Sequence, residues 1–475
     1  MIYKYYGPPG TGKTYKLISR ARAYHKTGTR LDRIGYFAFT RKAAKEAKAR
    51  MPVVDSLLPF FQTFHSFAYK TLNLNEENVM QPVHYELLGK KLGIRVSYSD
   101  KYNDEESVYL TCNNPYFQLI NRAVNKGIDI EDEFDLGEHD RKEINWDTLN
   151  HIYKNFLVYK QYHKLYDFND MIRLLIDYDK VPKFDVVFID EAQDLSPLQW
   201  KLYDKIKEKT KDIYLAGDDD QAIFAWAGAD VNRFINEPAK EKVLMYSKRI
   251  SKAVQQASEI PISKIAGNRK IKKYLPRDYE GESQYISTIN QLDLTKDKWL
   301  ILTRTKDQAL GIMEDLYKSN LYYQSNKGKS FKVRLYQRIK NYLSWVNDDA
   351  QLDEKQWKDI VEYTNKNKIT EKEDWYDLFT KASEKDKNYI RSLLEQKENL
   401  DSPARIWVST IHAIKGGEED NVILCMHQGR TVQKSVKRSQ AKLDEEHRVW
   451  YVGITRARNN LYKLKTKNKE KEYQI

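Results

Sequence analysis

Two short stretches carry residues whose types and spacing could do chemistry, and the first lies almost at the start of the chain. Residues 7–14 read GPPGTGKT, which fits the pattern G-x-x-x-x-G-K-[ST]. Glycines let the backbone wrap around phosphate oxygens, Lys13 can reach the β- and γ-phosphates, and the Thr14 hydroxyl can take a place on Mg²⁺. The pattern predicts a site for ATP and Mg²⁺. The residues expected to bind the nucleotide are Gly7, Pro8, Pro9, Gly10, Thr11, Gly12, Lys13 and Thr14.

The second stretch is the acidic pair Asp190-Glu191, which directly follows the apolar run FDVVFI. This placement puts two carboxylates at the carboxyl end of a strand, where open α/β sheets bind ligands. Asp190 is expected to hold Mg²⁺ together with Thr14, directly or through water. Glu191 is expected to orient and deprotonate an attacking water.

The elements that must position these residues follow from local pattern. A short β-prone run precedes the glycine loop and a helix-forming segment follows it, as the motif requires. Apolar runs alternate with helical segments along the chain, which predicts two parallel α/β sheets. The other expected strands are 33–39, 212–216, 243–246, 299–302, 406–409 and 422–426, with 243–246 restarting the alternation after the first sheet.

Two stretches interrupt this alternation and are expected to be helical insertions. Residues 71–165 are charged and Tyr-rich, and residues 347–396 are charged and shorter. The expected division is a first domain of 1–70 plus 166–236 and a second of 237–346 plus 397–475.

Composition narrows the class of protein. The 475 residues carry a formal net charge of +13, which suits a polyanionic partner. The two cysteines, Cys112 and Cys425, lie far apart, so a zinc site or cysteine-ligated iron–sulfur cluster is not expected. No run approaches the ~18 apolar residues of a membrane span, and the chain starts in a strand rather than a signal peptide. A cytoplasmic location without membrane partners is expected, or the host cytoplasm if the protein is viral.

The order of motifs resembles the UvrD/Rep-type superfamily 1 helicases, with matches from residue 7 to residue 458. The matching segments after the glycine loop are FAFTRKAA (37–44), TFHSF (63–67), YDFNDMIRLL (166–175), LAGDDDQAIFAWAGAD (215–230), YSKRIS (246–251), LTRT (302–305), STIHAIKGGEEDNVIL (409–424) and EEHRVWYVGITRAR (445–458).

This resemblance implies an α/β fold with two RecA-like P-loop domains, each with a parallel sheet and a mainly helical insertion. ATP would be hydrolysed in the cleft between the domains to move along single-stranded DNA, 3′ to 5′, and to unwind duplex in replication, repair or recombination. The implied partners are single-stranded and partly duplex DNA and an unidentified loading protein. The chain itself is expected to be monomeric.

The resemblance also implies roles for single residues. Gln221 would sense the γ-phosphate, Arg20 would lie at the nucleotide and Glu418 would hold the ribose. Arg249 and Arg456, both expected from the second sheet, would act as arginine fingers. The implied catalytic set is Lys13, Asp190, Glu191, Gln221, Arg249 and Arg456.

The implied DNA-binding residues come from both halves of the chain. Aromatic faces can stack on any base, which gives grip without sequence readout. Phe224 and Trp226 are the expected stacking residues, and core packing is the alternative role for Trp226. His65 and His412 are expected to donate hydrogen bonds rather than to transfer protons. The full set is Phe39, Thr40, Thr63, His65, Phe224, Trp226, Thr410 and His412.

Three departures from the family pattern bear on these expectations. Six residues stand before Gly7 in this sequence, so the adenine-reading glutamine of the family is not expected here. Lys248 stands where the family often has an adenine-stacking tyrosine, a role open to Tyr246 or Tyr15. Alanines flank Trp226 where arginines are common in the family.

Other functions share part of this signature. A translocase that strips proteins from DNA has every motif of an unwinding enzyme, and the motifs do not separate DNA from RNA. A ring-forming P-loop ATPase shares GPPGTGKT but would take its arginine finger from a neighbouring subunit. A non-catalytic DNA-binding scaffold would not need Lys13, Thr14, Asp190 and Glu191 intact.

Overall fold

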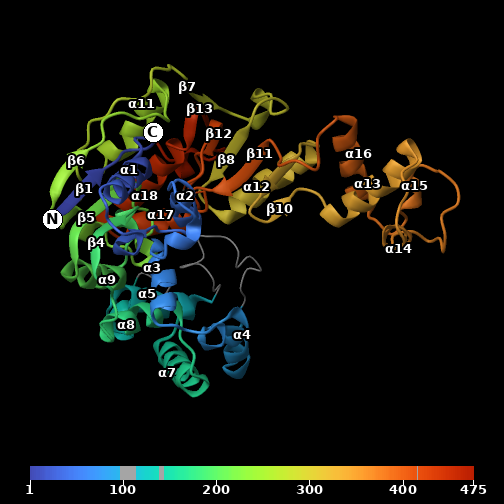
Figure 1. Ribbon diagram of the computed structural model, residues 1–475. Coiled ribbons are helices and arrows are strands. Elements are labelled where there is room, and N and C mark those ends of the chain that lie inside the picture. Colours follow the sequence, from blue (N-terminus) through green and yellow to red (C-terminus); the bar gives the residue numbers. More distant parts are fainter. Residues whose placement is uncertain (97–113, 138–143, 415, 475) are drawn as a thin grey trace. The chain divides into compact units, whose positions relative to one another are not determined.

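The computed structural model describes residues 1–96, 114–137, 144–414 and 416–474 (Figure 1). Cys112 lies outside the described residues. The chain forms two compact units that interleave in sequence. The first unit comprises 1–252, 259–279 and 436–452, and the second comprises 253–258, 280–435 and 453–475.

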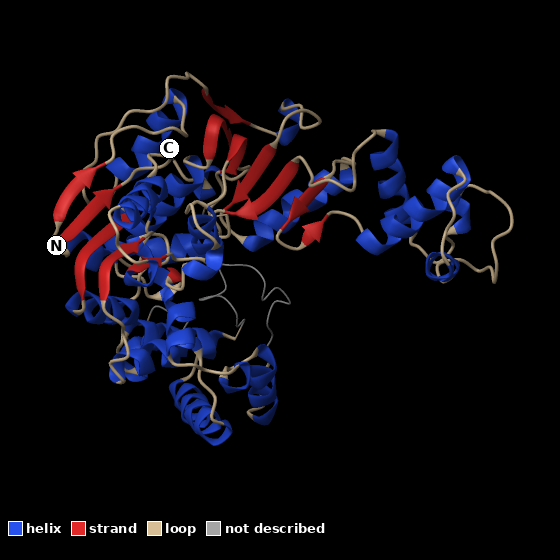
Figure 2. Cartoon of the chain, in the orientation of Figure 1, coloured by secondary structure: helices blue, strands red, loops and turns tan. Residues whose placement is uncertain are grey.

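The first unit contains a six-stranded sheet in the order β3-β2-β4-β5-β1-β6. Figure 2 draws the strands of the chain in red. All neighbouring strands are parallel. The strands are β1 Ile2–Tyr6, β2 Ile34–Phe37, β3 Phe61–Gln62, β4 Phe184–Ile189, β5 Thr210–Gly217 and β6 Lys240–Val243.

Helices cover both faces of this sheet because successive strand residues point to opposite sides. In β1, Tyr5 packs into one apolar core and Tyr6 into the other. The helices that take part are α1 Lys13–Lys26, α2 Arg41–Ala49, α3 Phe64–Thr71, α8 Phe168–Asp177, α9 Pro197–Glu208 and α10 Val231–Asn236.

The insertion expected at 71–165 contains helices with a core of their own. Phe117, Leu149 and Phe156 are among its buried residues. The helices are α4 Pro82–Lys91, α5 Pro115–Lys126, α6 Ile130–Asp135 and α7 Trp146–His163. Figure 1 shows α4 and α7 at the end of the first unit that lies away from the sheet.

The prediction of a strand at 243–246 that restarts the alternation after the first sheet is wrong. The structure has β6 at Lys240–Val243, and it pairs with β1 at the edge of the first sheet, so it completes that sheet rather than opening a second one. Its Lys-Glu-Lys sequence lacks the apolar run by which the other strands were recognised. Charged side chains are the usual protection of an exposed sheet edge, and this explains why the pattern was missed.

The second unit contains a seven-stranded sheet in the order β10-β9-β11-β8-β12-β13-β7. Its pairs are parallel except for β10 with β9. The strands are β7 Glu282–Ile286, β8 Trp299–Thr303, β9 Tyr323–Ser325, β10 Gly328–Lys329, β11 Ile406–Thr410, β12 Glu419–Cys425 and β13 Ala457–Leu464.

A helical bundle with a separate core belongs to this second unit. Tyr342, Ile360 and Phe379 are fully buried in it. The bundle helices are α13 Val333–Asp348, α14 Glu354–Val361, α15 Trp375–Leu378 and α16 Glu384–Glu395. The remaining helices of the chain are α11 Lys252–Ser263, α12 Lys306–Lys318, α17 Arg430–Val436 and α18 Gln440–Ile454.

The described chain also has short 3₁₀ turns, and three of them lie in the segments that follow β4 and β5. These three are 192–194, 219–221 and 225–227, and the others are 31–33, 55–57, 76–78, 289–291 and 469–471. None of the described helices is long and apolar enough to cross a membrane.

Candidate nucleotide site

The glycine loop connects β1 to α1 and is held by hydrogen bonds at both of its ends. The Gly7 N–H donates to the Gly217 carbonyl at the end of β5, 2.9 Å away. Lys13 Nζ donates to the Gly7 carbonyl at 2.8 Å, so the lysine side chain lies along the loop. α1 begins at Lys13, and the free N–H groups of its first turn face the loop, as an anion site requires.

Two glycines of the loop could not carry a side chain. A Cβ on Gly7 would lie 2.0 Å from Lys13 Cγ. Gly10 has φ +73°, and a Cβ there would lie 2.2 Å from Arg249 Cβ. The loop therefore needs glycine both for its left-handed backbone and for its close neighbours.

Asp190 meets the loop from the end of β4. Thr14 Oγ1 donates to Asp190 Oδ2 at 2.6 Å, and the Tyr36 hydroxyl donates to the same oxygen at 3.0 Å. Burial, followed by the neighbouring Glu191 carboxylate, raises the pKa of Asp190 to about 6. The glycine loop and the acidic pair Asp190-Glu191 thus meet in the folded chain.

Glu191 stands in a left-handed backbone conformation, with φ +54°. Such a conformation costs a residue other than glycine about 1–2 kcal/mol, and at the end of a strand that carries a candidate site it is consistent with a functional role. Gln193 Nε2 donates to Glu191 Oε2 at 2.6 Å and so orients the carboxylate.

The segment after β6 packs against the loop. Ser247 Oγ donates to the Pro9 carbonyl at 2.7 Å, and the Lys248 N–H donates to the Gly10 carbonyl at 2.9 Å. These contacts place Arg249 beside the loop. Arg249 was expected to come from the second sheet, but it belongs to the first unit because β6 is a strand of the first sheet.

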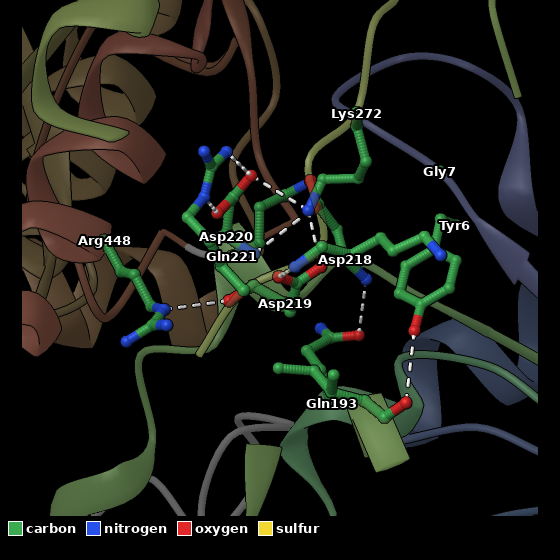
Figure 3. Close-up of polar contacts among 12 residues, drawn as sticks. Tyr6, Gly7, Gln193, Asp218, Asp219, Asp220, Gln221, Lys272 and Arg448 are labelled. Atoms are coloured by element: carbon green, nitrogen blue, oxygen red, sulfur yellow. Dashed lines mark hydrogen bonds and ion pairs between the residues drawn. The ribbon is translucent and has the colours of Figure 1, made fainter. Parts of the chain in front are cut away.

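Gln221 lies in the 3₁₀ turn after β5, within a buried network that Figure 3 shows. Gln221 Nε2 donates to Asp218 Oδ2 at 2.7 Å. The Asp218 N–H donates to Gln193 Oε1 at 3.0 Å, so one glutamine links the ends of β4 and β5. Gln221 and Glu191 therefore belong to one hydrogen-bond network.

Arg20 lies farther along α1 than the other predicted nucleotide residues. It lies seven positions after Lys13, which corresponds to about 10 Å along a helix axis. Its side chain is exposed, and a hydrogen bond with the Tyr5 hydroxyl raises the pKa of Arg20.

Three of the predicted DNA-binding residues have local structural roles. Thr40 and Thr63 cap the N-termini of α2 and α3 through their hydroxyl oxygens. His65 is buried with its ring edge-on to Phe168, 5.6 Å between centroids. Burial, with a smaller effect of Arg41, lowers the pKa of His65 to about 4, so the ring is neutral near pH 7.

The predicted aromatic residues of the first unit form a row. Phe39 stacks on Phe224 with ring centroids 5.3 Å apart, and Phe224 is followed by Trp226 at 6.3 Å. Phe224 is 4% exposed, whereas Trp226 is half-buried. Trp226 is thus the more exposed ring of this pair.

Four predicted residues belong to the second unit. Thr410 ends β11 and caps the following turn, where the Ala413 N–H donates to its Oγ1 at 3.3 Å. His412 lies in that turn. Glu418 precedes β12 and accepts from Arg458 Nε at 3.2 Å. Arg456 is buried and donates from NH1 to the Gly417 carbonyl at 3.3 Å.

Several residues of the first unit's candidate site were not predicted from the sequence. Tyr36 on Asp190 and Gln193 on Glu191 come from segments read only as strand and acidic loop. Lys272, Arg269 and Arg448 surround Asp218–Asp220. The available signal was electrostatic, because three adjacent aspartates after a buried strand require nearby cations.

The glycine loop, the acidic strand end and two mainly parallel sheets define an α/β P-loop protein with two RecA-like domains. Residues 5–242 match the UvrD/REP helicase N-terminal domain, and residues 335–468 match the UvrD-like helicase C-terminal domain. The chain belongs to the UvrD/Rep helicase family, as the motif order indicated.

Curated relatives agree with this assignment at low identity. The chain is 25% identical over 387 residues to the ATP-dependent DNA helicase PcrA of Staphylococcus epidermidis, which covers 72% of this chain and 52% of that protein. It is 25% identical over 390 residues to the putative ATP-dependent DNA helicase YjcD of Bacillus subtilis (72% and 50%). It is 26% identical over 352 residues to DNA helicase II of Haemophilus influenzae (65% and 46%). The chain spans about half the length of these relatives.

Proposed function

We propose that this chain is an ATP-driven motor that moves 3′ to 5′ on single-stranded DNA and unwinds the duplex ahead of it. The observation that supports it best is the 2.6 Å hydrogen bond between Thr14 and Asp190, which unites loop and acidic strand end across 176 positions of sequence. Family membership supports the use of ATP and DNA.

The donor set at the loop fits Mg²⁺. Among the described residues no group of three or more His, Cys, Asp or Glu side chains is placed to hold a metal ion, so the protein's share of the site would be the Thr14 hydroxyl and the Asp190 carboxylate. Hard oxygen ligands, completed by phosphate oxygens, are what Mg²⁺ prefers. When bound, Mg²⁺ would neutralise phosphate charge and hold Asp190 in its ionised form.

The chain's own residues would then have separate roles in ATP hydrolysis. Lys13 leaves the Gly7 carbonyl for the phosphates, Glu191 accepts the proton of the attacking water, and Gln221 orients near the γ-phosphate. Arg249 and Arg456 supply positive charge as phosphoryl transfer proceeds, and Arg20 and Glu418 hold the nucleotide.

The proposal extends to DNA and to domain organisation. Trp226 would stack on a base, beside Phe39 and Phe224, with Thr40, Thr63, His65, Thr410 and His412 along the strand's path. The domain boundaries given from sequence are part of this proposal, except that β6 at Lys240–Val243 belongs with the first sheet. A monomeric chain and an unidentified loading protein complete it.

The first test is ATP hydrolysis with Mg²⁺, with and without single-stranded DNA, at low and moderate salt. Strong stimulation by the strand that weakens as salt rises is expected, because phosphate contacts release counterions. A rate of ATP hydrolysis that is the same with and without nucleic acid would contradict the proposal of a DNA motor and favour a ring-forming ATPase. A matched RNA strand tests the choice of polymer.

Lys13→Ala and Glu191→Gln are expected to lower ATP turnover by at least about 100-fold while DNA binding is retained. Turnover and fluorescence anisotropy of a labelled strand provide the two measurements. DNA-stimulated turnover near the parent level in Glu191→Gln would refute the general-base role. A strand-displacement assay then separates unwinding from protein stripping, since a stripping translocase consumes ATP without displacing a strand.

A further inference from the structure

A buried triplet of carboxylates follows β5 directly, beside the residues proposed for hydrolysis. Asp218, Asp219 and Asp220 are each 0% exposed. Burying adjacent like charges is unfavourable unless cations and hydrogen bonds compensate them. The groups that compensate these three carboxylates therefore set the geometry of the loop that ends in Gln221.

Lys272 is the central compensating group (Figure 3). Its Nζ lies 2.9 Å from Asp218 Oδ1 and 2.8 Å from Asp220 Oδ2, and it also donates to Asp219 Oδ1. The lysine side chain is 2% exposed. Burial favours a neutral amine, but the three carboxylates outweigh it and raise the pKa of Lys272, so the group is a cation.

The other contacts to the triplet are more peripheral. Arg269 forms two hydrogen bonds with Asp220, at 2.9 and 2.8 Å. The Lys270 N–H donates to Asp219 Oδ2 at 2.8 Å, and Arg448 Nε donates to the Asp219 carbonyl at 3.0 Å. Lys272 is the cation that contacts Asp218, the aspartate bonded to Gln221.

Asp218 joins the two catalytic groups. Its carboxylate accepts from Gln221 Nε2, and its N–H donates to Gln193, whose Nε2 donates to Glu191. A carboxylate only accepts, so it turns the NH₂ group of Gln221 toward itself and fixes where the amide oxygen points. The position of Asp218 thus sets the orientation of the Gln221 amide directly and of Glu191 through one intermediate.

We infer that Lys272 is a positioning residue for ATP hydrolysis, because it holds Asp218 where the carboxylate orients Gln221 and, through Gln193, Glu191. The inference rests on the proposed function. Lys272 acts through Asp218 rather than on the nucleotide. Its loss should lower kcat far more than it changes KM for ATP, since the glycine loop and Lys13 are left intact.

The test is Lys272→Met, which keeps length and apolar volume but removes the charge. With single-stranded DNA and Mg²⁺, kcat should fall about tenfold or more while KM for ATP changes by less than about twofold. The matched control is Lys270→Met on the same segment. Its side chain pairs with Glu241 instead, and its N–H to Asp219 survives the substitution, so its kcat should stay within about twofold of the parent.

A second variant separates positioning from folding. Lys272→Met combined with Asp219→Asn removes one negative charge with the positive one, and the substituted amide keeps an oxygen for the Lys270 N–H. The thermal midpoint should recover toward the parent value while kcat stays at least about fivefold low, because Asp218 still lacks its ammonium partner. Recovery of midpoint and kcat together would show a purely structural role and overturn the inference.

The remaining outcomes are distinct. An unsubstituted chain without ATP turnover overturns the proposed function and this inference together. Turnover in the unsubstituted chain that survives Lys272→Met within twofold overturns this inference alone. An equal loss of kcat in Lys270→Met also overturns it, since that side chain does not contact the carboxylate triplet.

Discussion

At the scale of one residue, the buried carboxylate of Asp190 destabilises the folded state at neutral and higher pH. The carboxyl group is buried beside Glu191, and its pKa is raised to about 6, above the 3.8 of an ordinary aspartate. The folded state therefore binds this proton more tightly than the unfolded state. The carboxyl group favours folding most below about pH 4, and this contribution is lost as pH rises through 6.

Asp190→Asn is accordingly expected to raise the free energy of unfolding at pH 8 by about 1–3 kcal/mol, because the buried charge is removed. The gain should shrink at pH 5, where the parent carboxyl is largely protonated. Urea unfolding at the two pH values measures both quantities. ATP turnover should be lost at either pH, and a variant less stable than the parent at pH 8 would contradict the electrostatic account.

The neighbouring aromatics Phe224 and Trp226 are expected to respond differently to substitution. Phe224→Ala removes a buried ring stacked on Phe39 and should cost about 3–5 kcal/mol of stability.

Trp226→Ala should lower DNA stimulation of ATP turnover more than it lowers the basal rate, since base stacking contributes about 1–3 kcal/mol. Equal loss of both rates in Trp226→Ala would assign that ring to packing.

At the scale of elements, the glycine loop depends on what packs against it. Ser247 and Arg249 approach Gly10 so closely that its backbone conformation and its missing side chain are both required. Segment 247–249 is therefore as much a part of the nucleotide site as the glycine motif itself.

Gly10→Ala and Gly28→Ala make a matched pair. Both glycines have positive φ, +73° and +95°, but a Cβ on Gly28 meets nothing within 4 Å. Gly28→Ala should cost about 1 kcal/mol of backbone strain and leave nucleotide binding unchanged. Gly10→Ala should cost more and weaken the binding of a non-hydrolysable ATP analogue, measured by calorimetry. Equal affinities in the two variants would show that the Gly10 contacts are not needed.

Local pattern was sufficient for the elements with strong signals. The apolar runs at β4, β5, β8 and β12 and the glycine loop all lie where the sequence predicted them. The bounds and the sheet of β6 were not predicted, because edge strands are polar. As a result, Arg249 was assigned to the wrong sheet. The partners of Asp218–Asp220 were not predicted, for another reason. Lys272 is more than 50 positions away, and periodicity carries no information about which distant cation meets a buried carboxylate.

At the scale of the whole molecule, the described thiol reports on the second unit. Cys425 ends β12 in the interior of the second sheet, and burial raises its pKa to about 12. With Cys112→Ser as background, a thiol reagent at pH 8 should label Cys425 at least about 100-fold more slowly in the folded than in the urea-unfolded chain. Rapid labelling of the folded chain would show that the second sheet opens locally.

The interleaving of the two units has a consequence for how the protein is made. The Asp219 carbonyl receives its hydrogen bond from Arg448, 229 positions later. At about 5–20 residues per second, a ribosome adds those residues in on the order of 10 to 50 s. Once residue 243 has been added the first sheet has all its strands, but the carboxylate turn beside Gln221 still lacks its last partner. The turn beside Gln221 is therefore completed only near the end of translation, and a nascent chain that stalls before α18 would carry a finished sheet whose carboxylate turn lacks the hydrogen bond from Arg448.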